Sequence, residues 1–223
     1  MKLLEEQGVD LETTTVVIYT SPFQRCIDTS LGIARHVPNT VLRLELALGE
    51  WMSESFFEDD IAPASKLIAR QQEALARQQA HAFSVARSSG TKPMLPLVDY
   101  GYRPLRTEFE FPERYGDMLK RFDEARLHCL ATATSQLPKP AQHHMIMLFV
   151  THAVGVNALL DGFRNQLTRP IETGYCSISR VTRMKTLALP TTPLPSPKEE
   201  KDSNELHSDE WNIDILASDT HIH

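Results

Sequence analysis

The sequence predicts an α/β sandwich built on a parallel sheet. Two short runs, Thr15–Thr20 and Met145–Thr151, are apolar almost throughout, and each is followed at once by an amphipathic helical pattern. Continuous apolar runs of this length are typical of parallel strands buried on both faces. Strand–helix units of this kind favour helices packed against a mostly parallel sheet.

The residues after each apolar run predict where a helix begins. After the first run, Ser21 is the expected N-cap, Pro22 the first helical residue and Gln24 the partner of the cap. The two predicted helices then carry apolar residues at helical spacing, namely Phe23, Ile27, Leu31 and Ala34 in the first, and Val154, Ala158, Leu159 and Phe163 in the second.

The rest of the chain predicts two more helices and two later strands. Residues 63–87 and 112–135 are rich in helix formers, whereas 175–184 and 211–216 have strand patterns. At about 150 residues per domain, residues 1–223 are expected to form one domain. Within it we expect a helical insertion at about 53–111 and a flexible, Pro-rich loop at about 189–208.

Composition narrows the classes of partner. The chain has 23 Lys and Arg against 29 Asp and Glu, a net charge of −6, which argues against direct nucleic-acid binding and against an anionic membrane surface. Its 3 cysteines are too scattered for a disulfide framework, so they are expected to be buried or half-buried thiols. Without an apolar run long enough to span a membrane, we expect a cytoplasmic or nuclear protein.

Arg25 and His152 stand at equivalent places in the predicted fold. Each comes just after a buried strand, in or next to the first turn of a helix. Ligands of open α/β sheets bind at that edge, and helix N-termini favour anions. A guanidinium and an imidazole there predict a phosphate-sized pocket. Taken singly, Arg25 also fits a solvated first-turn arginine, and His152 fits a hydrogen-bonded residue at the end of a strand.

Glu50 is the candidate acid. It follows the apolar stretch Val41–Leu48 and lies between Gly49 and Trp51. A carboxyl group in apolar surroundings has a raised pKa and can act as a general acid. On local evidence alone, the pattern favours an ordinary loop carboxylate.

Ordered motifs along the chain resemble those of the histidine phosphatase (phosphoglycerate mutase-like) superfamily. Residues 18–26 with Thr29 are similar to its second-strand motif, residues 48–51 to the segment that supplies the acid, and residues 149–155 to the motif around its second histidine. Residues 174–177 and the closing segment 211–221 resemble the last strands of fungal relatives.

The resemblance implies a three-layer α/β/α sandwich with a mostly parallel sheet and a phosphomonoesterase that forms a phosphohistidine. It implies no metal or other cofactor. On this view Arg25 clamps the phosphate, His152 is the second histidine of the pocket, and Glu50 protonates the leaving oxygen. The substrate would be a phosphorylated small molecule or a phosphoprotein.

One departure from the family affects activity. The nucleophile of the family lies in an Arg-His-Gly motif, and this chain contains none. Only fourteen residues precede Thr15, so the sheet is expected to lack its first strand and the chain to be a truncated form. Since loss of a hydrolase nucleophile costs about six orders of magnitude in turnover, we expect an inactive or impaired enzyme.

A second hypothesis is a non-catalytic interaction subunit. The long helical middle and the Pro-rich loop resemble the fungal branch that includes a small subunit of RNA polymerase III transcription factor C. On that view the pocket is no longer catalytic and the insertions bind a protein partner.

Two other kinds of phosphate-binding protein are not supported by the sequence. Nucleotide-binding glycine motifs are absent from it, and no cysteine has an arginine six residues later, as a cysteine-dependent phosphatase requires.

Overall fold

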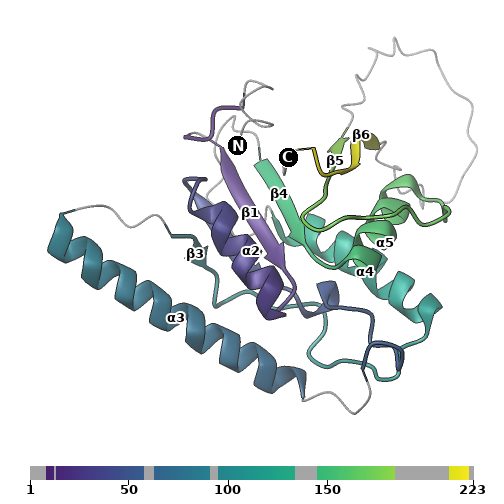
Figure 1. Cartoon of the computed structure of the whole chain (residues 1–223), viewed down its shortest axis with the longest axis horizontal. Helices are drawn as coiled ribbons and strands as arrows, with labels where there is room; N and C mark the ends of the chain where they lie inside the picture. The colour runs from purple at the N-terminus through teal and green to yellow at the C-terminus, as the bar shows by residue number, and fades with distance from the viewer. Residues whose placement is uncertain are drawn as a thin grey trace, which may run out of the picture.

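The computed structural model describes residues 9–12, 14–57, 63–90, 95–133, 145–183 and 211–220. Figure 1 shows their arrangement. In chain order the elements are β1 (Thr15–Thr20), α2 (Gln24–Ala34), β2 (Thr40–Leu44), the 3-10 turn η1 (Leu46–Leu48), α3 (Ala64–Ser89), β3 (Leu97–Val98), α4 (Tyr115–Ala133), β4 (Met145–Val150), α5 (Ala153–Arg164), β5 (Ile178–Arg183) and β6 (Trp211–Ser218).

Within the described ranges, the main sheet has four strands in the order β3-β2-β1-β4, and all their pairings are parallel. β1 lies in the middle, with Val16 opposite Thr40 of β2 and Ile146 of β4. This confirms the predicted α/β fold. The two apolar runs that predicted it are neighbours in the sheet.

Helices cover both faces of this sheet, so the predicted three-layer α/β/α sandwich is confirmed. Val16 and Ile18 of β1 lie in one buried cluster with apolar residues of α2 and with Leu75 of α3. Val17 and Tyr19 lie in a second cluster, with residues of α4 and α5. Because both faces of β1 are buried, its sequence is continuously apolar rather than alternating.

The predicted helices occur, with one shifted start. α2 begins at Gln24, and its N-cap is Phe23 in extended conformation, so the prediction of Ser21 as cap and Pro22 as first helical residue is wrong. The Ser21 hydroxyl lies instead 2.9 Å from His152 Nε2. β3 was not predicted, because two residues carry no periodic pattern.

The two late strands form a sheet of their own. In the described part of the chain, β5 and β6 pair antiparallel with each other and with no strand of the main sheet. Among the described residues, β4 pairs only with β1, so its other edge is open on the side where Figure 1 shows β5 and β6. The Pro-rich loop at 189–208, the N-terminal residues and five of the nine histidines (His143, His144, His207, His221 and His223) lie outside the described residues.

The described helices and the three cysteines were also subjects of sequence predictions. Within the described ranges, no helix has the length and hydrophobicity needed to cross a lipid bilayer. Cys26 and Cys129 are buried free thiols, but Cys176 is exposed, so the prediction of buried or half-buried thiols is wrong for Cys176.

Candidate functional site

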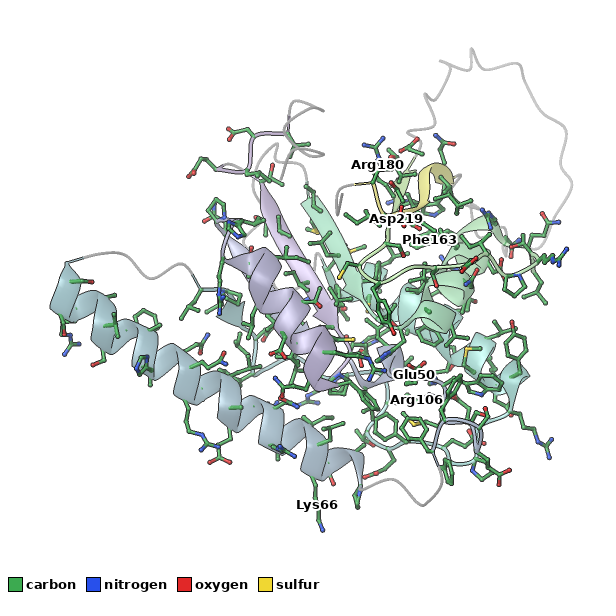
Figure 2. All side chains as sticks on the ribbon, viewed as in Figure 1. Glu50, Lys66, Arg106, Phe163, Arg180 and Asp219 are labelled. Atoms are coloured by element: carbon green, nitrogen blue, oxygen red, sulfur yellow. The ribbon has the colours of Figure 1, made fainter. Side chains whose placement is uncertain are left out.

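Three parallel strands deliver the candidate residues to one edge of the sheet. Arg25 lies in the first turn of α2, directly after β1, and His152 is the N-cap of α5, directly after β4. Glu50 follows β2 and the turn η1. Because β2, β1 and β4 are parallel neighbours, their carboxyl ends meet, and Glu50 lies beyond the arrowheads of β1 and β4 in Figure 2.

The three side chains are in direct contact. Arg25 Nη2 lies 2.7 Å from His152 Nδ1 and 2.8 Å from Glu50 Oε2. His152 Nδ1 is in turn 3.2 Å from Glu50 Oε2. The prediction that Arg25 and His152 meet at the rim of the sheet is therefore confirmed, and Glu50 joins them.

Ser21 orients the imidazole of His152. Its buried hydroxyl lies 2.9 Å from His152 Nε2 and also accepts the Phe23 N–H at 3.3 Å. Since a guanidinium only donates, the Arg25 contact makes Nδ1 the acceptor and leaves the ring proton on Nε2, where Ser21 Oγ accepts it. When Nδ1 is also protonated, it donates to Glu50 instead, because one nitrogen cannot accept from Arg25 and donate to Glu50 at once.

The charge on Glu50 differs from the sequence expectation. Burial alone would raise the pKa of its carboxyl, as expected from the apolar neighbours. The hydrogen bond and charge of the imidazolium form of His152, together with the Trp51 N–H and the Arg25 guanidinium, outweigh burial and hold the pKa below its ordinary value. The predicted raised pKa is therefore wrong, and Glu50 is an ionised partner of Arg25.

Cys26 lies against the same histidine but is not activated. Its Sγ is 3.8 Å from His152 Nε2, and burial raises the pKa of the thiol to about 11. At neutral pH it is a neutral thiol, whereas cysteine nucleophiles react as thiolates.

A buried ion pair holds the loop that carries Glu50. Arg121 of α4 donates to the carbonyl oxygens of Ala47, Gly49 and Glu50 at 2.6, 3.2 and 3.2 Å, and to the Glu113 carboxylate at 2.6 and 2.8 Å. Glu113 also binds the other end of the loop, since its backbone and side chain together pair with the backbone of Met52 and the indole N–H of Trp51. We name this pair the Glu113–Arg121 latch.

Sequence reasoning missed the latch and the contact of Ser21. Glu113 and Arg121 lie more than sixty residues after the loop they hold, and no local pattern links the two segments. Ser21 belongs to the motif that resembles the family, but a serine before a proline reads first as a helix cap.

A cavity of about 200 Å³ lies beside the latch rather than over Arg25 or His152. Its lining is densely charged, with Arg106, Lys120 and Arg121 close to four carboxylates, those of Glu108, Glu110, Glu113 and Asp117. Because the charges of both signs nearly balance, this cavity has no clear preference for an anion or a cation.

Comparisons with known proteins identify a solved structure of low sequence identity. No protein-family model matches the chain, and no curated protein matches it. Among solved structures, it is similar to an ecdysone phosphate phosphatase from Bombix mori in complex with tungstate. The TM-score is 0.49 and the identity 15%, over 89% of this chain and 70% of that chain. At this level of similarity the insect enzyme's activity does not transfer to this chain.

Proposed function

We propose that the site binds the phosphoryl group of a phosphomonoester, in the manner of a histidine phosphatase. The observation that carries the proposal is the contact of Arg25 with His152, 2.7 Å apart at the carboxyl edge of a parallel sheet. Both residues lie at helix N-termini, where unpaired N–H groups and the helix dipole favour an anion.

An incoming anion displaces Glu50 from Arg25. The Arg25 side chain is 61% exposed, so its pair with Glu50 has the small stability of a surface ion pair, about 0–1 kcal/mol. A phosphate dianion carries twice the charge of the Glu50 carboxylate, and it presents several acceptor oxygens to the N–H groups of the guanidinium. Glu50 is then left beside the bound group, where the family places its proton donor.

Hydrolysis needs a nucleophile that the described residues do not supply. In that part of the chain, His152 is the only histidine in the hydrogen-bonded cluster, and His128 bonds instead to the Arg103 carbonyl. The open edge of β4 ends beside His152. We infer that a strand bearing the Arg-His-Gly motif pairs there in an active form, and that residues 1–223 alone bind phosphate but hydrolyse esters poorly.

Titration with inorganic phosphate tests the binding. Arg25→Ala and His152→Ala should each weaken affinity about tenfold to a hundredfold, the loss of one hydrogen bond to a charged group. Arg77→Ala is the matched control, because Arg77 is an exposed arginine of α3 that pairs with Glu73. Equal affinity of all four proteins, or no binding to any, would overturn the proposal.

An assay of a phosphomonoester separates binding from turnover. The chain of 223 residues is compared with a version extended upstream to include any in-frame Arg-His-Gly codons. We expect hydrolysis only from the extended version. If no such codons exist upstream, the truncation hypothesis fails while the binding proposal stands.

The exposed side of α3 favours the second candidate, an interaction subunit. Of its 26 residues only four are buried, and Phe83 and Val85 are 60% and 52% exposed. The end of α3 that carries them projects beyond the other elements (Figure 1). Affinity capture with the native chain and with Phe83→Ser/Val85→Ser tests this; a chain that is monomeric and without partners in both forms contradicts it.

A further inference from the structure

Three phenylalanine rings adjoin the charged cluster. Phe23, between β1 and α2, lies edge-on to the His152 ring with centroids 5.2 Å apart, and the Arg25 guanidinium lies 5.4 Å from its centroid. Phe57 and Phe109, from two other segments, lie 6.4 and 6.1 Å from Phe23. We name these three rings the phenylalanine wall.

The phenylalanine wall is not part of the protein core. Neither of the two buried clusters that flank the sheet includes any of its rings, and each ring is only half-buried. Large apolar side chains gain free energy when water is removed from them. Half-buried rings beside Arg25 and His152 therefore offer apolar surface that a bound molecule can cover.

The neighbouring polar groups do not favour a sugar or another polyol. The Trp51 indole N–H donates to the Glu113 carbonyl, and the hydroxyls of Ser53 and Ser55 bond to each other. These donors would have to break existing bonds to serve a ligand. An apolar ring needs no hydrogen-bond donor from the protein. Aromatic rings prefer centroid separations of about 4.5–7 Å, and the rings of the wall are already separated by distances in this range.

We propose that the phenylalanine wall binds the aromatic ring of an aryl phosphate whose phosphoryl group is held by Arg25 and His152. The inference rests on the proposed function and specifies its substrate class. All substrates of such a site share the phosphoryl group. The phenylalanine wall therefore distinguishes them by the leaving group, which is the part of the ester other than the phosphoryl group.

Three probes test the inference by calorimetric titration of the whole chain: inorganic phosphate, glycerol phosphate and phenyl phosphate. Phenyl phosphate should bind about tenfold more tightly than glycerol phosphate, because one or two ring contacts contribute that much. If inorganic phosphate binds and phenyl phosphate is no tighter than glycerol phosphate, the inference fails and the proposed function survives. If no probe binds, both fail.

Phe57→Ala and its neighbour Phe56→Ala form a matched pair. Phe57 belongs to the wall, whereas Phe56 is 60% exposed and contacts the Trp51 ring instead. We expect Phe57→Ala to abolish the preference for phenyl phosphate and to leave inorganic phosphate affinity unchanged, which also shows that the variant is folded. Phe56→Ala should keep the preference. Equal losses for all three probes in Phe57→Ala would mean that the ring only supports the fold, and would overturn the inference.

Phe23→Leu is a second variant, which preserves an apolar side chain against His152. It should lower affinity for phenyl phosphate more than affinity for inorganic phosphate. An unchanged ratio of the two affinities in both Phe23→Leu and Phe57→Ala would contradict a role for the wall.

Discussion

At the scale of single residues, Glu50 occupies the place that the proposed anion would take. Its Oε2 accepts from Arg25 at 2.8 Å and lies 3.2 Å from His152 Nδ1. These cationic and hydrogen-bonding neighbours hold its pKa below the ordinary value despite burial. A bound dianion would remove Arg25 and add negative charge, and both changes raise the pKa of the carboxyl. Anion binding is therefore expected to turn an ion-paired carboxylate into a proton donor.

Sulfate binding by Glu50→Gln tests this coupling, since sulfate does not titrate near neutral pH. At about pH 8 the variant should bind sulfate about three- to tenfold more tightly, because the competing carboxylate is gone. As the pH falls towards about 5, the native chain takes up a proton on binding and its affinity rises, so the difference narrows. Equal affinities at about pH 8 would contradict the coupling.

At the scale of elements, the Glu113–Arg121 latch places the Glu50 loop. Glu113 and Arg121 side chains are 3% and 8% exposed, and together they bind three carbonyls and one N–H of residues 47–52. Burying two charges is costly, and these contacts offset that cost only while both partners are present. The position of Glu50 thus depends on α4, an element distant in sequence.

Glu113→Ala should lower the free energy of unfolding by about 3–5 kcal/mol, because it leaves the Arg121 charge buried without its partner. Chemical denaturation measures this. Glu124→Ala is the control, since Glu124 pairs with Arg106 in a half-exposed ion pair and should change stability by about 0–1 kcal/mol. Equal losses of unfolding free energy in the two variants would show that the Glu113–Arg121 latch contributes no more to stability than a half-exposed ion pair.

Packing of α5 on α4 depends on a glycine. A Cβ on Gly155 would lie 2.5 Å from the ring of Phe122, which is fully buried, and 2.6 Å from Thr151 Oγ1. Gly155 lies in the first turn of α5, which begins after its N-cap His152.

Gly155→Ala is therefore expected to destabilise the fold by about 1–3 kcal/mol through overpacking. In Gly32→Ala, by contrast, the added methyl group of α2 meets nothing within 4 Å and should stabilise the helix by roughly 0.5–1 kcal/mol. Thermal unfolding of both variants checks the difference. A stabilising Gly155→Ala would show that α4 and α5 separate easily.

At the scale of the whole molecule, the strands that the structure describes divide into two sheets. β4 is apolar along its whole length and all six of its residues are half-buried, whereas five of the six residues of β1 are buried. Apolar edge strands with unpaired backbone groups promote association with another strand. We therefore expect low solubility of the isolated chain, or a partner strand on the open edge of β4.

Amide hydrogen exchange measures this edge directly. The amides of β1, which has a strand on each side, should be protected throughout. In β4 only alternate amides should be protected, because a parallel strand directs alternate N–H groups to each side. Uniform protection of β4, together with high solubility and a sharp thermal transition, would mean that the edge is covered.

The fold was largely predictable from local pattern, and the site only in part. Two continuous apolar runs, each before a helix signal, sufficed for the parallel sheet, and two residues after these runs were the ones that meet. The strand β3 was too short to show a pattern. The start of α2 was misplaced because a serine before a proline resembles a helix cap, while the fold directs that hydroxyl to His152.

The sequence by itself determined the class of fold and the edge where Arg25, Glu50 and His152 gather, because hydrophobic periodicity acts over short stretches of chain and the carboxyl ends of parallel strands share one edge. Only the tertiary structure decided the charge state of Glu50, the latch on its loop and the phenylalanine wall beside it. Those properties depend on contacts between segments as far apart as Arg25 and His152, and on how burial and neighbouring charges oppose each other at one carboxyl group.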